Sequence, residues 1–259
     1  MSHPRIRCAH FLLKAGAFIK SLALCVMKPA DLIEMNRRLY ADPANINSAC
    51  DEKYVASGLR DFEKALLKWA PKKGRNLLLL GVGSGREALV LAAKGFNVTG
   101  VDFVPEVVDY ATKRLARDGY RMKGLVQEIS QLNFPDNSFD IVWLSYNMYS
   151  SIPTRQRRIS MLQRISRTLK PDASLFCQFL YDSAHGRGRF LLRKLIAVLM
   201  CGNFQLEQGD HIHYGIEFAH AFTSKEVIRQ ELQQSEMNIR YIELDEIQDG
   251  RGYAILSRY

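Results

Sequence analysis

The clearest structural signal in this chain is Asn76-Leu-Leu-Leu-Leu-Gly-Val-Gly-Ser-Gly-Arg-Glu-Ala88, followed by Asn97-Val-Thr-Gly-Val-Asp102. The uninterrupted apolar run 77–80 predicts a strand that is covered on both faces of a sheet. Three glycines then allow a tight turn and let a ligand approach the backbone closely. Residues 86–94 continue as a helix whose first amides face the same space.

The acid that ends the second apolar segment indicates what kind of ligand binds there. Asp102 closes the predicted strand 97–102 and follows Gly85 by 17 residues. A carboxylate in this place can accept hydrogen bonds from ribose hydroxyls. The glycine spacing is GxGxG and not the GxGxxG of nicotinamide and flavin proteins. The pattern therefore predicts a nucleoside-cofactor site of a different type.

Four markers in order make the chain resemble the class I S-adenosylmethionine-dependent methyltransferases. They are the glycine loop, Asp102, the turn Phe134-Pro-Asp-Asn-Ser-Phe-Asp140 and Leu169-Lys-Pro-Asp172. The resemblance runs from about residue 76 to residue 180. It implies a doubly wound α/β fold with a mostly parallel seven-stranded sheet, and S-adenosyl-L-methionine as the cofactor.

The resemblance also implies roles for particular residues. The loop backbone would pack against the methionine part of the cofactor, Asp102 would hold the ribose, and Glu128 with the Ile129 amide would read the adenine edge. Ser145 and Tyr146 would face the methyl group. The full predicted cofactor set is Gly81, Val82, Gly83, Gly85, Asp102, Phe103, Glu128, Ile129 and Ser145.

One position departs from the family pattern. The family usually has an acid two residues before the first glycine, which helps to hold the cofactor's amino group, and this chain has Leu79 there. Glu87 is an alternative source of that carboxylate. The simpler interpretation is that Glu87 is an acid in the first turn of a helix, where it complements the helix dipole.

Further elements follow from the hydrophobic pattern and its breaks. We expect helices over 105–118, 155–169 and 224–234, and strands near 125, over 139–144, 174–180, 239–244 and 253–256. Residues 1–70 would form a helical N-terminal lid or extension, and residues 71–259 the cofactor-binding domain. An insert at about 181–222 would complete the lid over the methyl end of the cofactor.

Candidate substrate contacts lie after the fourth strand and in the insert. The substrate candidates are Tyr146, Asn147 and Tyr149, and the catalytic candidates are Tyr146, His213 and His220. Strand alternation would place His211 and His213 on one face. Because no third ligand has convincing spacing, we expect no metal and consider general-base chemistry or ordinary lid residues instead. Transfer from a sulfonium needs mainly in-line alignment of nucleophile and methyl carbon.

Positive charge is concentrated in two blocks. Residues 1–40 and 151–200 carry net charges of +5 and +8, whereas residues 201–259 carry −5. Each block contains an apolar run, Phe11–Met27 and Phe190–Met200, and basic residues interrupt both before the roughly 20 apolar residues of a spanning helix. The simpler interpretation is two packed lid helices, and the alternative is peripheral membrane contact. We expect a cytoplasmic protein, since a small-x-small cleavage site is lacking.

These observations predict a methyltransferase that acts on an O or N atom of a small, partly apolar metabolite. An RNA methyltransferase is the first alternative, with Arg155, Arg157, Arg158, Arg164 and Arg167 as a phosphate-contacting helix. It is disfavoured because residues 145–148 lack the Asn/Asp-Pro-Pro-aromatic signature of amino-group methylation on bases. A non-catalytic cofactor-binding protein, suggested by Leu79, is the second alternative. Oligomeric state does not follow from the sequence.

Overall fold

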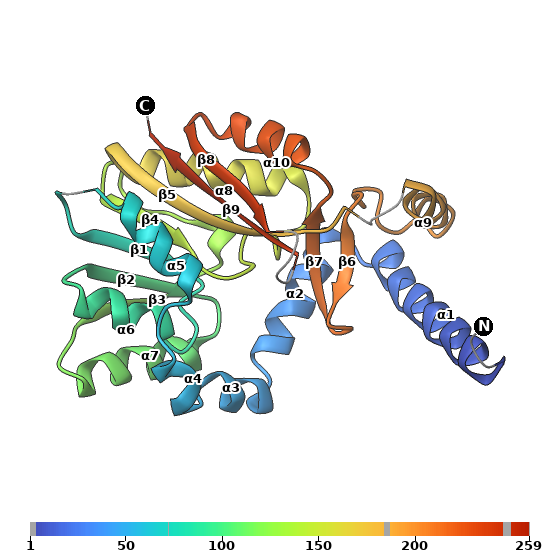
Figure 1. The fold of residues 1–259 in the computed structure, drawn as a ribbon, viewed down its shortest axis with the longest axis horizontal. Coiled ribbons are helices and arrows are strands. Elements are labelled where there is room, and N and C mark those ends of the chain that lie inside the picture. The colour runs from blue at the N-terminus through green and yellow to red at the C-terminus, as the bar shows by residue number, and fades with distance from the viewer. Residues whose placement is uncertain (1–3, 72, 184–186, 246–249, 259) are drawn as a thin grey trace.

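A computed structural model describes residues 4–71, 73–183, 187–245 and 250–258 of the chain. Its centre is an open, twisted sheet in the strand order β3-β2-β1-β4-β5-β9-β8 (Figure 1). Strands β1 to β5 pair in parallel, while β9 is antiparallel to both β5 and β8. The strands are β1 Asn76–Leu80, β2 Asn97–Asp102, β3 Met122–Val126, β4 Phe139–Leu144, β5 Leu169–Tyr181, β8 Asn238–Asp245 and β9 Arg251–Ser257. The predicted doubly wound α/β class is therefore confirmed.

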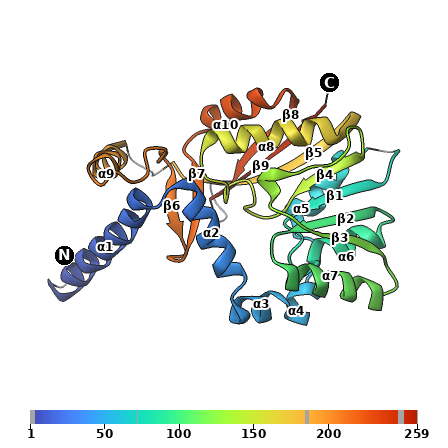
Figure 2. The ribbon, with the colours of Figure 1, turned by 180° about the vertical axis from the view of Figure 1, so that it is seen from behind.

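The apolar run of β1 is buried because helices cover both faces of the sheet. Leu77 and Leu79 pack in one hydrophobic cluster, and Leu78 and Leu80 pack in another on the opposite face. All four side chains are fully buried. The first face is covered by α5 Asp61–Leu66, α6 Arg86–Ala93 and α7 Pro105–Arg117, and the second by α8 Arg155–Thr168 and α10 Lys225–Leu232 (Figure 2).

The observed strands differ from the predicted ones at two points. Strand β5 begins at Leu169, five residues before the predicted start, because Leu169 already pairs with Phe139 of β4. A β-hairpin, β6 Asp210–His213 and β7 Glu217–Phe222, joins the end of β5 through Leu180 and Tyr181. The expected seven strands therefore form the main sheet, and the hairpin adds two more.

In the described part of the chain, α5 and four further helices precede the sheet. The four are α1 Pro4–Val26, α2 Pro29–Tyr40, α3 Pro43–Ala49 and α4 Glu52–Ala56, followed after α5 by a short 3-10 turn at Leu67–Trp69. Asp42 caps α3, since its Oδ1 accepts a hydrogen bond of 2.9 Å from the Ala44 amide. Buried Asn36 attaches α2 to the hairpin by two hydrogen bonds of 3.0 and 2.8 Å to the Phe218 backbone. These contacts connect the N-terminal region to the insert.

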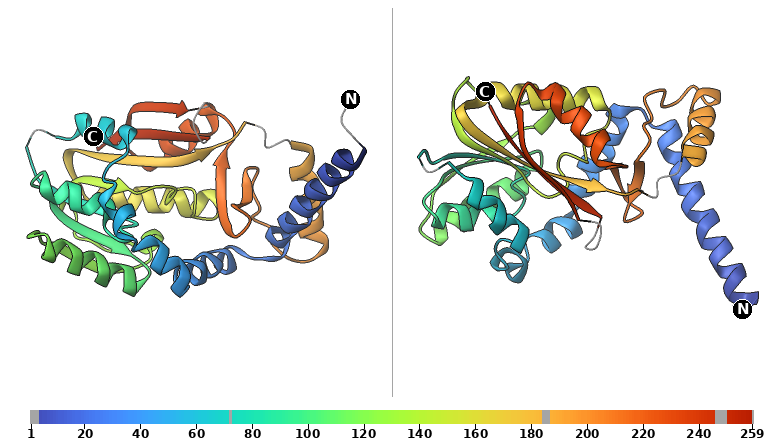
Figure 3. Two further views of the ribbon diagram at one scale, coloured as in Figure 1. Left: turned by 60° about the horizontal axis from the view of Figure 1, so that its bottom comes forward. Right: turned by 45° about the horizontal axis from the view of Figure 1, so that its top comes forward.

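Helix α1 and helix α9 Arg187–Leu199 lie side by side at one end of the molecule (Figure 3). Leu24 and Cys25 of α1 and Ala197 of α9 share a small buried cluster with Phe218. In the part of the chain that the structure describes, one helix, Arg5–Val26, is long and apolar enough to cross a membrane by length and composition. The interrupted apolar pattern did not predict this. Residues 184–186 of the expected insert lie outside the described residues.

Candidate functional site

A cavity of about 190 Å³ lies at the carboxyl ends of β1, β2 and β4. We call it the glycine-loop cavity. The sheet contributes the glycine turn, Asp102 and the segment after β4, and the N-terminal helices contribute the opposite side. Its lining residues are Tyr40, Asn45, Ala49, Tyr54, Gly81, Val82, Gly83, Ser84, Arg86, Glu87, Asp102, Phe103, Val104, Val107, Ser145, Tyr146 and Met148. The end of a parallel sheet is where ligands of doubly wound folds bind.

The glycine turn forms one wall of this cavity. The amides of Gly81 and Val82 donate hydrogen bonds of 2.8 and 3.0 Å to the Val101 carbonyl, which ties the turn to β2. Gly81 has a φ of 80°, and a Cβ there would lie 2.4 Å from Cγ of Met148. Position 81 therefore requires glycine both for its backbone angle and for the approach of the segment after β4.

Asp102 lies at the end of β2 and faces the same cavity. Its Oδ2 accepts a hydrogen bond of 3.0 Å from the Gly83 amide, and its Oδ1 accepts one of 3.2 Å from the Val104 amide. Burial raises the pKa of Asp102, and these backbone amides oppose the rise. The glycine loop and Asp102 therefore line one cavity, and their roles toward a cofactor stay predictions.

Glu87 reaches the cavity as part of a buried ion-pair network. Arg86 lies between two glutamates, with Nη2 2.7 Å from Oε1 of Glu63 and 2.6 Å from Oε1 of Glu87. The Ser145 hydroxyl donates a hydrogen bond of 2.7 Å to the same Glu87 oxygen. Burial raises the pKa of Glu87, and Arg86 lowers it. Glu87 lies in the first turn of α6, as predicted, and its side chain is also buried on the cavity wall.

The position that normally carries the family's acid is occupied by a core residue. Leu79 is fully buried and packs against the α6 side of the sheet, so it offers no polar group to the cavity. Glu87 is thus a carboxylate close to the glycine turn that could take over the missing role. In the sequence, Glu87 lies in the first turn of the predicted helix 86–94, and this position indicated a role at the cofactor only weakly.

Tyr146 lies at the edge of the cavity between two guanidinium groups. The Cζ atoms of Arg60 and Arg251 are 4.5 and 4.4 Å from the centre of its ring. Arg251 also donates a hydrogen bond to the Tyr146 hydroxyl, and Tyr214 of the hairpin turn hydrogen-bonds to the same side chain. Burial raises the pKa of Tyr146, whereas Arg251 lowers it. The hairpin therefore reaches the cavity through Tyr146.

Other predicted residues lie outside the lining of this cavity. Tyr149 is fully buried, its hydroxyl donates a hydrogen bond of 2.6 Å to Glu231, and its ring stacks on Phe222. Asn147 is half-buried with a φ of 52°. Glu128 and Ile129 follow β3, where the Ser130 hydroxyl hydrogen-bonds to Glu128. The placement of these residues does not test their predicted roles.

The two candidate histidines belong to the hairpin. Nδ1 of His213 lies 3.2 Å from Nε2 of His211, so the two side chains share a face as strand alternation predicts. Burial lowers the pKa of His213, and Arg251 lowers it further. His220 is buried on β7 and its Nδ1 is 2.8 Å from Oδ1 of Asp210. Neither histidine lines the glycine-loop cavity.

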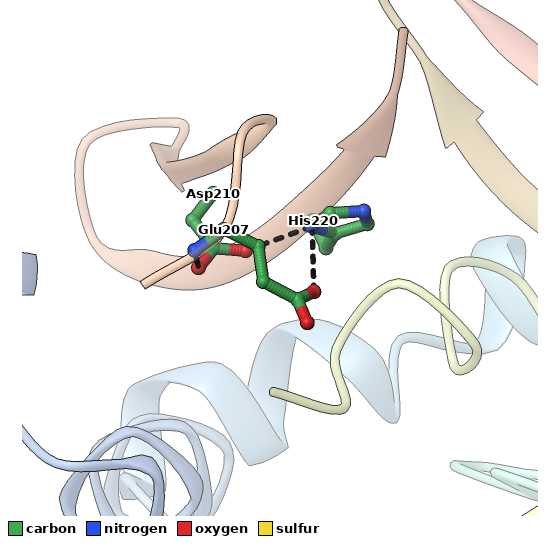
Figure 4. Close-up of side chains that lie close together, drawn as sticks. All are labelled: Glu207, Asp210 and His220. Carbon is green, nitrogen blue, oxygen red and sulfur yellow. Dashed lines mark hydrogen bonds and ion pairs between the residues drawn. The ribbon is translucent and has the colours of Figure 1, made fainter. Parts of the chain in front are cut away.

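His220, Asp210 and the half-buried Glu207 form a second group that has the composition of a cation site (Figure 4). One ligand atom from each lies within 4.8 Å of the others. Arg158 already supplies positive charge there, since its Nη2 is 2.8 Å from Oε2 of Glu207 and its Nε is 2.7 Å from Oε1 of Glu231. The group is therefore organised around a guanidinium, and we assign it no metal.

This arrangement also corrects the predicted phosphate-contacting helix. Arg158 is buried and ion-paired to two glutamates, so it is not available to a phosphate. Arg155 likewise lies 4.0 Å from Glu231. The basic face of α8 is smaller than the sequence suggested, which weakens the interpretation as an RNA-binding helix.

Several cavity residues were missed in the sequence. Tyr40, Asn45 and Tyr54 come from three short helices, and no sequence motif predicts that they line a cavity. The Tyr40 hydroxyl hydrogen-bonds to Glu217 of β7, which links the N-terminal helices to the hairpin beside the cavity. These residues become neighbours of the glycine turn only when the N-terminal helices fold over the sheet.

Comparison with known proteins agrees with the fold. A family model described as "Methyltransferase domain" matches residues 77–172, which include the glycine loop, Asp102 and Ser145. A cypemycin N-terminal methyltransferase from Streptomyces sp is 31% identical over 142 residues, covering 52% of this chain and 56% of that protein. A demethylmenaquinone methyltransferase from Clavibacter sepedonicus is 32% identical over 111 residues, covering 42% of this chain and 43% of that protein. The chain thus spans about half the length of the curated relatives it matches.

A solved structure covers more of the chain. The SAM-dependent methyltransferase from Methanosarcina mazei aligns with a TM-score of 0.60 and 25% identity, over 78% of this chain and 98% of that one. Its alignment, the matching family model and the strand order all agree with one family. Residues 77–172 match the methyltransferase domain, and the family model, the curated relatives and the solved structure together support a class I S-adenosylmethionine-dependent methyltransferase.

Proposed function

We propose that this protein transfers the methyl group of S-adenosyl-L-methionine to an oxygen or nitrogen atom of a small, partly apolar acceptor. The observation that carries the proposal is that the glycine turn and Asp102 line one cavity and are hydrogen-bonded to each other. The curated relatives are methyltransferases with different acceptors, a peptide N-terminus and a demethylmenaquinone by their names. They therefore support the reaction type more strongly than any acceptor.

In this proposal two carboxylates of the cavity hold different parts of the cofactor, the ribose and the methionine ammonium group. Asp102 accepts hydrogen bonds from the ribose hydroxyls at the end of β2. Glu87 accepts a hydrogen bond from the ammonium group of the methionine part, because Leu79 offers no acid. Glu128 and the Ile129 amide keep their predicted role at the adenine edge, which would extend the site beyond the lining of the cavity.

Tyr146 is the residue that we place nearest to the acceptor. It follows β4, lines the cavity and is held by Arg60 and Arg251, so its ring has a defined position. A fixed aromatic wall would orient a partly apolar acceptor for in-line attack on the methyl carbon. The N-terminal helices would exclude water from the sulfonium, whose positive charge disappears as the reaction proceeds. His213 and His220 lie off the cavity, so we give neither the task of general base.

The test is calorimetric titration of the full chain with S-adenosylhomocysteine, with NAD as the control ligand. Micromolar binding of the first and no binding of the second is the expected result, and it would justify a search among small acceptors. Tight binding without turnover over a broad acceptor panel would instead favour a non-catalytic cofactor-binding protein. Absence of binding to either ligand would refute the assignment of the cavity.

A further inference from the structure

Helix α9 carries its apolar residues on the outside. Leu191, Leu192, Leu195, Val198 and Leu199 follow the spacing i, i+1, i+4, i+7 and i+8, which places them on one face of a helix. Their exposed fractions run from 47% to 74%. The inward face instead holds Ala197 and the charged residue Arg193, which is 6% exposed. A helix that only covers the domain would show the reverse pattern.

The first half of α1 also exposes large apolar side chains. Phe11, Leu12, Leu13 and Ile19 have exposed fractions of 63% to 71%. The two helices contact each other, and α1 extends from the hairpin end of the domain (Figures 1 and 3). Together they form what we call the α1–α9 face. Many large apolar side chains exposed on two contacting helices mark a docking site.

The charge of this face identifies its partner. Residues 1–30 and 183–206 contain no aspartate or glutamate, while α1 carries Arg5, Arg7, Lys14 and Lys20, and α9 carries Arg189 and Lys194. Two copies of such a face would bring like charges together, which opposes self-association. An anionic bilayer offers both hydrocarbon for the leucines and negative charge for the basic residues.

A second cavity, of about 710 Å³, lies between the two helices. Phe11, Lys14 and Phe18 of α1 line it, as do Arg189, Phe190 and Arg193 of α9; the remaining lining is Ala15, Ala17, Ser21, Asp182, Gln208, Gly209 and His211. Arg193 donates a hydrogen bond of 2.8 Å to the Asp210 carbonyl, but its buried Nε has no partner among the described residues. A buried guanidinium with an unused donor suits an anionic oxygen of a lipid head group. One carboxylate, Asp182, is on the same lining.

We propose that the α1–α9 face docks the protein on the surface of an anionic phospholipid bilayer. Both helices lie in the interfacial plane, their leucines and phenylalanines enter the acyl boundary, and a phosphate group sits near Lys14, Arg189 and Arg193. Helix α1 does not span the bilayer, because its residues Leu24 and Cys25 are fixed in the small buried cluster that α1 shares with α9 and the hairpin. Residues 5–20 alone, at 1.5 Å each, would reach about 24 Å, less than the ~30 Å of hydrocarbon.

The proposal is tested by co-sedimentation of the full chain with vesicles. Vesicles of mixed phosphatidylglycerol and phosphatidylcholine should bind it, and vesicles of phosphatidylcholine alone should bind it at least tenfold more weakly. Replacement of the outward leucines, L191E/L195E/L199E, should lower binding to the anionic vesicles at least tenfold. These side chains are exposed, so the variant should keep its thermal unfolding midpoint. The matched control is V227E, an exposed apolar residue on α10.

Three results would overturn the proposal. The first is a wild-type chain that stays in the supernatant with both kinds of vesicle. The second is a dimer in sedimentation velocity that the triple substitution converts to monomer, since the face would then be an interface between copies. The third is retention on vesicles after an alkaline carbonate wash, which would indicate that α1 spans the bilayer. Cofactor binding by the triple variant should be unchanged, so the outcome is independent of the proposed function.

Discussion

Two regions of this molecule contain the same charged arrangement, a buried arginine between two glutamates. On the glycine-loop side Arg86 contacts Glu63 and Glu87, and beneath the hairpin Arg158 contacts Glu207 and Glu231. Both arginines are nearly inaccessible to solvent. The first group adjoins a cavity, whereas the second is completed by protein groups.

The surroundings of the two groups explain this difference. Glu231 accepts hydrogen bonds from Tyr149 and Arg158, and Glu207 lies beside His220. In the first group, the Glu87 oxygen that contacts Arg86 accepts from Ser145, and the side chain lines the cavity. A buried carboxylate whose partners are all protein groups holds elements together. One that faces a cavity beside a glycine turn is placed for a ligand. Ion-pair chemistry alone does not separate these roles.

The largest expected effect is on the free energy of unfolding, and it distinguishes the buried Arg158 from the less buried arginine beside it. Replacement of Arg158 by methionine leaves Glu231 buried without its cation and should lower the free energy of unfolding by about 3–5 kcal/mol. Urea unfolding measures it. Arg157→Met, on the next position of α8 and less buried, should change stability by less than about 0.5 kcal/mol. Equal losses in the two variants would show that the buried group is not structurally special.

The next effect concerns the ligand side alone. Asp102→Ala should weaken S-adenosylhomocysteine binding at least tenfold, about 1.4 kcal/mol or more, because the ribose loses a buried carboxylate partner. Calorimetry measures the affinity, with Asp109→Ala, an exposed acid on α7, as the control. Unchanged affinity of the Asp102 variant would place the cofactor elsewhere.

A smaller effect compares the two groups directly. Glu87→Gln should weaken S-adenosylhomocysteine binding about fivefold, close to 1 kcal/mol, because the ligand ammonium loses a charged acceptor. Glu207→Gln, its counterpart beneath the hairpin, should leave the affinity unchanged. Binding of 5′-methylthioadenosine, which lacks the amino-acid part of the cofactor and its ammonium group, should not respond to Glu87→Gln. Weaker binding of 5′-methylthioadenosine by Glu87→Gln, or an equal loss of S-adenosylhomocysteine affinity in both variants, would show that the two groups do not differ in this way.

The same contrast explains what the sequence could predict. The sequence could place the glycine loop, Asp102 and Ser145 at one edge of the sheet because a strand, a turn and a strand end are local patterns with a fixed geometric result. Tyr40 and Arg158 were not placed correctly, because their partners Glu217 and Glu231 are 177 and 73 residues away. The outward leucines of α9 have an ordinary helical period. Only the packing of Arg193 inward shows which face is covered.

The last and smallest effect is the pH dependence of the group beneath the hairpin. Burial lowers the pKa of His220 from 6.5 to about 3, so the folded state keeps this imidazole neutral where the unfolded chain protonates it. Its contribution to stability is present above pH 6.5 and is lost as the pH falls toward 3. Burial also raises the pKa of Asp210 from 3.8 to about 6, and that contribution acts oppositely, growing as the pH falls from 6 to 3.8.

The two contributions therefore nearly cancel between pH 6 and pH 3.8, and the histidine is best observed above that window. Between pH 7 and pH 6 the stability difference between the wild type and His220→Asn should shrink by about 0.7 kcal/mol, because only the wild type loses the His220 term. Unfolding curves at the two pH values measure this, with the exposed His10→Asn as the control. A stability difference that grows from pH 7 to pH 6 would mean that His220 is charged in the folded state. The group would then be an ion-paired cluster, in which Asp210 balances His220 as Glu231 balances Arg158.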